Sequence, residues 1–427
     1  MDQKAMAPEN PEERIVWVGL SWTYAFYAVG GLYVVGPVIG WLLAGVLAAR
    51  VLRVENRIVI PLPVWLWIIG MLMMLVAVVV GHLQNNLGTG QLIKSSIGWA
   101  KGWALLALFI LAGSSLQIRP ELIARAAMRV CLHTLLLLPV FIGAWLLRLP
   151  ETAYVSPLKA VGGPGPEFFA VSLYELDPQS GLPRWRLFTP WAPALGFVAN
   201  IFFLLALIER ERSWRIIGIS ASVLMILMSQ SRLALLALLF VIGVRFCLVY
   251  LRGPILAFAC MVASLIFAYA GAWILEGLET GYESIKAARA DSTRVREALA
   301  RIALHRWRTE APVWGHGVVE RGPHLVEYMP IGSHHSWYGL LFVKGMVGFL
   351  ALALPLIFSL LTLGLKALRG GIVELTGFFC VLLLFLYTFG ENLEILAYLI
   401  WPALIFIGLA HGARPAARTT PVEEACS

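Results

Sequence analysis

Long apolar runs alternate with short polar breaks along almost the whole chain. With roughly 20 apolar residues needed for each membrane-crossing helix, this pattern predicts about twelve crossings. The first two, broken at Gly30-Gly31, form either two short spans or one long one. An even number of crossings returns both termini to the same side. The predicted spans lie near 15–30, 32–49, 60–80, 98–117, 126–147, 191–208, 215–229, 233–251, 254–274, 337–363, 371–389 and 394–411.

Two polar segments interrupt the series. Residues 148–190 are rich in Pro and Gly, which predicts an irregular loop rather than a helix. Residues 275–335, between the ninth and tenth predicted spans, are expected to form a large, partly helical loop. There Asp291 can cap a helix that runs to about Glu310, just before Pro312. The pattern therefore predicts an all-α integral membrane protein whose residues 1–427 form a single polytopic domain with two long loops.

Within the predicted loop helix, the two arginines near its start differ in position. At 100° per residue, Arg294 falls on a face of ordinary solvated charge. Arg296 falls among Ala300, Ala303 and Trp307, on the face expected to be packed. We therefore expect Arg296 to point inward.

Basic residues near the span ends set the orientation, because cytoplasmic connections of membrane proteins are enriched in Lys and Arg. One set of connections carries many of them, whereas the opposite short turns are poor in positive charge, which predicts that this side and both termini are cytoplasmic. The two long loops then lie outside. The basic residues are Arg50, Arg53, Arg57, Arg119, Arg125, Arg129, Arg210, Arg212, Arg215, Arg245, Arg252, Lys366, Arg369, Arg414 and Arg418.

Composition agrees with a membrane protein and narrows its chemistry. The chain is 59% hydrophobic and 14% charged, more apolar than a soluble core of this size could hide. Its basic residues are spread among the membrane loops, which argues against a nucleic-acid partner. The five cysteines form no CxxC pair, and few carboxylates are clustered on the predicted outer side, so neither a metal site nor a cofactor is expected.

Three arginines on the predicted outer side could bind phosphate. Soluble nucleotide donors are scarce there, so an external transferase would use a lipid-linked donor, and a guanidinium can present two parallel N–H donors to its phosphates. Arg232 occupies the tight turn between two apolar helices, Arg186 precedes a span, and Arg296 lies in the loop helix. Each also has a purely structural interpretation: snorkelling for Arg232, a solvated loop position for Arg186 and a loop salt bridge for Arg296.

His335 is the candidate proton acceptor, because an imidazole can take a hydroxyl proton near neutral pH. It lies at the mouth of the tenth predicted span, next to His334 and followed by Ser336 and Tyr338. The alternative is an interfacial histidine bonded to water or backbone. His334 and His316 are interpreted as solvated or supporting.

These residues resemble the motifs of the O-antigen ligase and polymerase superfamily. The family's H-[NS]-x-[YF] motif is similar to His335-Ser336-Trp337-Tyr338, and its following G-x-x-G to Gly345-Met346-Val347-Gly348. An upstream Arg, Pro and G-x-G look like Arg296, Pro312 and Gly315-His316-Gly317, and a Ser-Arg pair looks like Ser231-Arg232. Arg186 ahead of Thr189-Pro190 is also similar. Two positions depart from the pattern, Lys344 where an acid is common and Ser336 where Asn is commoner.

The resemblance implies metal-independent, inverting transfer of a glycan from undecaprenyl diphosphate to lipid A–core, on the periplasmic side of the bacterial inner membrane. In that interpretation Arg232 and Arg296, with Arg186, bind the donor diphosphate, and His335 orients or deprotonates the acceptor hydroxyl. Supporting positions are Arg294, His334, Ser336 and Tyr338.

Other functions remain open at this point. An O-antigen polymerase or a protein O-oligosaccharyltransferase of the same superfamily would carry the same motifs. A polytopic transporter or flippase would more typically place ionisable groups at mid-membrane within broken helices and show repeated halves. No internal repeat is visible here, and the polar residues concentrate in an outer loop.

Overall fold

The computed structural model describes residues 7–53, 59–177, 181–250, 290–332 and 335–412, together with scattered positions between 255 and 276. The predicted ninth span, 254–274, is therefore described only in part, and His334 lies outside the described residues. The helices are α1 (Pro11–Ser21), α2 (Thr23–Ala28), α3 (Leu32–Arg53), α4 (Leu62–Gln84), α5 (Thr89–Lys101), α6 (Trp103–Ser115), α7 (Pro120–Leu146), α8 (Ala192–Ala206), α9 (Arg212–Ser229), α10 (Arg232–Tyr250), α12 (Ala290–Glu310), α13 (Ser336–Ala367), α14 (Ile372–Tyr387) and α15 (Leu393–Gly412).

The protein is a multi-pass membrane protein. Within the described residues, eight helical stretches are long and apolar enough to cross a membrane, with α5 and α6 forming one of them, and α8 and α14 are shorter apolar helices. The first predicted span is divided into the short helices α1 and α2, and the fourth is broken at Gly102. Several helices start with Pro in the first turn, where its missing N–H costs nothing.

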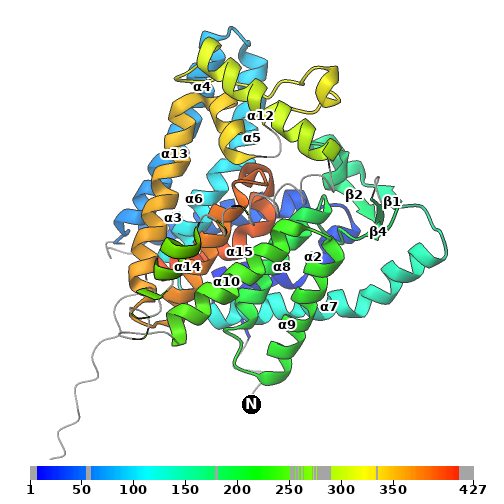
Figure 1. The fold of residues 1–427 in the computed structure, drawn as a ribbon, viewed down its shortest axis with the longest axis vertical. Coiled ribbons are helices and arrows are strands. Elements are labelled where there is room, and N and C mark those ends of the chain that lie inside the picture. The colour runs from blue at the N-terminus through cyan, green and yellow to red at the C-terminus, as the bar shows by residue number, and fades with distance from the viewer. Residues whose placement is uncertain are drawn as a thin grey trace, which may run out of the picture.

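Helix α15 lies at the centre of the bundle (Figure 1) and is almost entirely buried. It packs closely against α6 because glycines face each other's backbone. A Cβ on Gly113 would lie 2.1 Å from the carbonyl oxygen of Ile405, and one on Gly408 would lie 2.1 Å from that of Ile110. Small residues allow membrane helices to approach this closely, and van der Waals packing then stabilises the pair.

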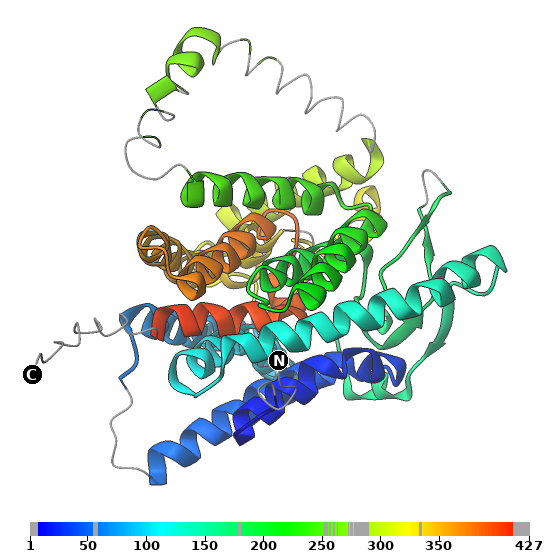
Figure 2. The same ribbon diagram turned by 90° about the horizontal axis from the view of Figure 1, so that it is seen from below.

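The described helices alternate between two ends of the bundle, which are separated in Figure 2. We call one the basic end: there the start of α1, the end of α15 and the α6–α7 connection meet, since Asn10 bonds to the Gln117 carbonyl and Gly412 packs on Ser114. We call the other the loop end: it carries the strands, α12, and the starts of α10, α13 and α15 (Figures 1 and 2). Both described chain ends thus lie at the basic end.

The described residues of the 148–190 segment, 148–177 and 181–190, contain two short antiparallel strand pairs and no α-helix. Strand β1 (Thr152–Val155) pairs with β2 (Ala170–Ser172), and β3 (Glu175–Leu176) pairs with β4 (Pro183–Arg184), both antiparallel. Two 3-10 turns, η2 (Pro157–Val161) and η3 (Pro166–Phe169), lie between β1 and β2. The Tyr27 hydroxyl donates to the Ser172 carbonyl at 2.9 Å and accepts from its N–H at 2.7 Å, which anchors this segment to α2.

Helix α12 ends at Glu310, as predicted, but its packed face differs from the expected one. Val295, Ala298, Leu299 and Ala303 pack, with Val326 and Ile331, against Phe342 of α13. Arg296 is exposed, so the prediction that it lies on the packed face was wrong. The packed ridge starts one residue earlier, at Val295, and follows the i, i+3, i+4 spacing from there.

Candidate active site

The short α14–α15 turn, residues 388–392, organises the loop end. Ser336, the first residue of α13, donates its N–H to the Thr388 carbonyl at 3.0 Å. Its hydroxyl donates to the Glu391 carbonyl at 2.7 Å and accepts from the Leu393 N–H at 3.1 Å. The buried Ser336 therefore fastens the start of α13, and with it His335, to this turn.

His335 caps the start of α13 and lies between two aromatic rings. Its ring centroid is 4.1 Å from that of Tyr338 and 5.7 Å from that of Phe389. Within the described part of the chain, its buried Nδ1 has no hydrogen-bond partner. Burial lowers the pKa of His335 to about 4, because the apolar surroundings disfavour the charged form. The imidazole is thus neutral at neutral pH.

Glu391 is the site residue that sequence reasoning missed. Its carboxylate is buried and accepts a hydrogen bond from the Trp191 indole N–H at 3.0 Å. Burial raises its pKa to about 7, while the Trp191 bond and the positive charge of Arg296 act in the opposite direction. The available signal was an acidic residue in the short break between the last two predicted spans, on the same side as His335.

Arg232 reaches the same turn from the start of α10. Arg232 lies two residues after Gln230, whose left-handed backbone (φ 49°) allows the chain to reverse direction between α9 and α10. The neighbouring Leu233 packs on Gly390, where an added Cβ would lie 2.6 Å from Leu233 Cδ2. Asn200 fixes the register, since its amide donates to the Ala234 carbonyl at 3.0 Å and to the Tyr387 hydroxyl at 3.2 Å. The exposed Arg232 side chain therefore begins beside the turn that carries Glu391.

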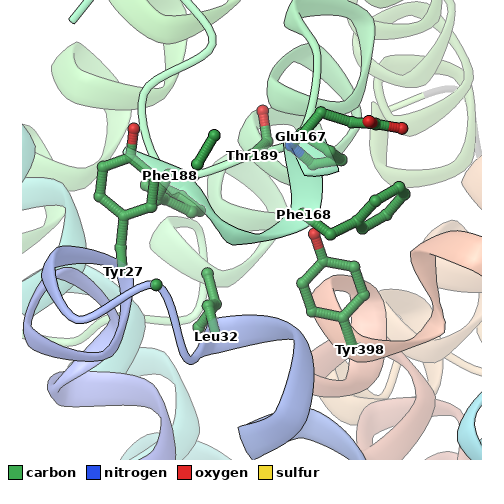
Figure 3. A pocket seen from close by; sticks show the side chains of 10 residues that line it. Tyr27, Leu32, Glu167, Phe168, Phe188, Thr189 and Tyr398 are labelled. Carbon is green, nitrogen blue, oxygen red and sulfur yellow. The ribbon is translucent and has the colours of Figure 1, made fainter. Parts of the chain in front are cut away.

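Arg186 is buried, so its interpretation as a solvated loop residue was wrong. Its guanidinium donates to the Pro190 carbonyl and lies 3.4 Å from a Glu175 carboxylate oxygen. A small cavity adjoins this segment, lined by Tyr27, Glu167, Phe168, Thr189, Pro190 and Tyr398 among others. Figure 3 shows the side chains of Tyr27 and Tyr398 beside the two segments that carry Glu167 and Thr189.

The segment that contains Arg186 connects the two turns of the site. The Trp185 N–H donates to the Met228 carbonyl at 3.2 Å, and the Gln230 side chain donates to the Pro183 carbonyl at 3.0 Å. At its other end Trp191 bonds to Glu391. Arg186 therefore stabilises this connecting segment, residues 183–191, which we call the strap between the α9–α10 and α14–α15 turns.

The glycine motifs attach the large loop to α13 through backbone hydrogen bonds, an arrangement that we call the lock. At Gly345 the backbone leaves the helical conformation (φ 61°), and the Pro312–Gly317 stretch bonds to the opened helix there. The N–H groups of Met346 and Val347 donate to Pro312 and Val313, and those of His316 and Gly317 donate to Phe342 and Val343. This interlocking gives both motifs a structural role and sets how α12 lies over the start of α13.

His316 is held in this lock and is buried rather than solvated. Its Nδ1 lies 2.9 Å from the Phe342 carbonyl and its Nε2 lies 2.8 Å from a Glu310 oxygen. Arg294 is exposed on α12. In the described part of the chain, no group of three or more His, Cys, Asp or Glu side chains is arranged to hold a metal ion.

The structure thus brings His335, Ser336 and Tyr338 together at the start of α13, with Arg232 at one side of the Glu391 turn and Arg296 within electrostatic range of the Glu391 carboxylate. A comparison with curated proteins finds no match. Residues 217–353, from α9 to the middle of α13, match the family described as O-antigen ligase. This stretch contains Arg232, Arg296 and His335, and the match supports the resemblance of the chain to the O-antigen ligase/polymerase superfamily.

Proposed function

We propose that the protein is an O-antigen ligase, which transfers a glycan from undecaprenyl diphosphate to lipid A–core. The observation that carries this proposal is the meeting of His335 with the elements that bear Arg232 and Arg296 around one short turn. A neutral imidazole beside cationic groups suits a reaction in which a hydroxyl attacks and a diphosphate leaves. The loop end would face the periplasm and the basic end the cytoplasm, in line with the distribution of Lys and Arg.

The two arginines bind the diphosphate and stabilise the charge that develops on it as the sugar departs. The acceptor oxygen forms its bond to the anomeric carbon while the bond from that carbon to the diphosphate oxygen breaks, which inverts the configuration. With a pKa near 4, His335 accepts a hydrogen bond from the acceptor hydroxyl. It takes the proton as the new bond forms, because the hydroxyl becomes strongly acidic at that stage.

The test is a reconstituted reaction in detergent with undecaprenyl-diphosphate-linked glycan, lipid A–core and a chelator. A glycan attached to lipid A–core supports the ligase. Loss of activity in chelator overturns metal independence, and intact donor after prolonged incubation points to transport, since a transporter needs a second compartment.

The acceptor separates the ligase from its nearest alternatives. A polymerase would extend the glycan on its polyprenyl carrier, and a protein O-oligosaccharyltransferase would require a peptide hydroxyl. All three activities would use the same arginines and histidine. Supplying the acceptors one at a time and following the product by mass therefore decides among them.

A further inference from the structure

Glu391 stands in an unusual position for an acidic residue. It is buried at the loop end of an apolar bundle, although the proposed substrate there is an anionic diphosphate. A carboxylate next to a phosphate site is unfavourable because like charges repel, and a cation placed between them offsets that repulsion. The arrangement around Glu391 fits the placing of such a cation, an inference that rests on the proposed function.

The carboxylate is fixed from two sides. Trp191 donates its indole N–H to one carboxylate oxygen at 3.0 Å. The backbone of Glu391 is held by Ser336, whose hydroxyl donates to its carbonyl, and by its own N–H, which donates to the Tyr387 carbonyl at 2.8 Å. The negative charge therefore has a defined location relative to His335, which precedes Ser336.

The loop helix carries its arginine toward this charge. Val295, Ala298 and Leu299 belong to the cluster that packs against Phe342 and Tyr338, in the first turns of α13. Arg296 therefore lies on the part of α12 that covers the start of α13. Its guanidinium is close enough to act electrostatically on Glu391, but no ion pair within 4.0 Å joins these two residues.

We propose that Glu391 is a positioning residue for Arg296: its carboxylate, held by Trp191, draws the exposed arginine of α12 over the turn that anchors His335, ready to receive the donor diphosphate. When the diphosphate binds, the Arg296 guanidinium donates its hydrogen bonds to it. Because the separation exceeds an ion-pair distance, Glu391 orients the arginine without occupying its N–H donors. A flexible loop arginine preorganised in this way binds the donor at a smaller cost in conformational entropy.

A double-mutant cycle tests this coupling with the full-length protein in detergent. Glu391→Gln retains an oxygen acceptor for Trp191 but removes the charge. We expect it to lower kcat/KM for the donor by about tenfold, through a higher KM, as is typical of coupled pairs. In the Arg296→Gln background the same substitution should have almost no further effect, because no guanidinium remains to be positioned.

Two matched variants distinguish positioning from scaffolding. Trp191→Phe keeps the charge and removes the hydrogen bond, so its loss should be smaller than that of Glu391→Gln. Glu391→Asp keeps the charge on a shorter side chain and should restore part of the donor affinity. If Glu391→Gln cannot be recovered folded, the cycle is run with Glu391→Asp in both backgrounds.

The outcomes separate this inference from the proposed function. An equal loss in both backgrounds shows that Glu391 only stabilises the turn, and it overturns the inference while the proposed function stands. Unchanged donor kinetics in Arg296→Gln overturn the diphosphate role of Arg296 itself. A loss confined to the background that contains Arg296 supports the coupling.

Discussion

The two ends of the bundle use charge differently. At the basic end, arginines pair directly with carboxylates: Arg119 with Glu13 at 2.8 Å, Arg125 with Glu209 at 2.8 Å and Arg210 with Glu121 at 2.8 Å. At the loop end, the His335 ring has a buried nitrogen without a partner among the described residues, and Glu391 bonds an indole rather than a cation. Ion pairs at the basic end hold helices together. Ion pairs also occur in the loops of the other end, such as Arg186 with Glu175 at 3.4 Å, but His335 and Glu391 there keep bonding capacity for a ligand.

The sharpest test of this contrast is the pair of substitutions Arg232→Lys and Arg210→Lys. We expect Arg232→Lys to lower the transfer rate by about 10²-fold, because one ammonium cannot present paired donors to a diphosphate whose charge develops in the transition state. Arg210→Lys, in the exposed pair with Glu121, should leave the rate unchanged. Initial rates with saturating acceptor measure both variants. Near-normal transfer by Arg232→Lys would contradict diphosphate binding by paired donors at that position.

His335→Ala should lower kcat by roughly 10²-fold, within the usual range for general acid–base groups. Tyr338→Phe is the matched control, since it retains the aromatic ring that faces His335. Single-turnover measurements with preformed donor complex isolate the chemical step. Full activity of His335→Ala would show that the proton leaves by another route.

The pH profile separates the two ionisable groups of the site. Because the Glu391 pKa is raised to about 7, its carboxylate becomes protonated as the pH falls through that value, and kcat/KM for the donor should decline. Trp191, Arg296 and Tyr387 act on it. In Glu391→Gln the decline in kcat/KM near pH 7 should disappear. The decline near pH 4, where His335 takes a proton, should remain. If the decline in kcat/KM near pH 7 persists in Glu391→Gln, another group is responsible for it.

At the basic end the expected effect is on stability alone. Glu209 is buried, so Glu209→Gln removes the closer of the two carboxylates that pair with Arg125, the other being that of Glu211 at 3.1 Å, and should destabilise the protein by roughly 2 kcal/mol. The folded fraction should keep its specific activity. Thermal unfolding in detergent and activity per folded molecule measure the two quantities, and a selective loss of activity would break the division between the ends.

Much of the architecture followed from local sequence. The apolar runs predicted helices near nearly every described one, and the loop helix ends at Glu310 as expected. The short strands of residues 152–184 were missed because segments of two to four residues carry too little periodicity to be recognised. The face of Arg296 was assigned wrongly because several faces of α12 carry small residues, and only contact with Phe342 selects one.

The sequence by itself determined the membrane class, the sorting of charge between the ends and the residue types His335, Arg232 and Arg296, because hydropathy and side-chain chemistry are local properties. Tertiary structure decided which of these groups meet. It buried Arg186 in the strap, turned two glycine motifs into a lock, and placed Glu391 at the centre of the site. Such outcomes depend on contacts between residues far apart in the chain, which no local pattern encodes.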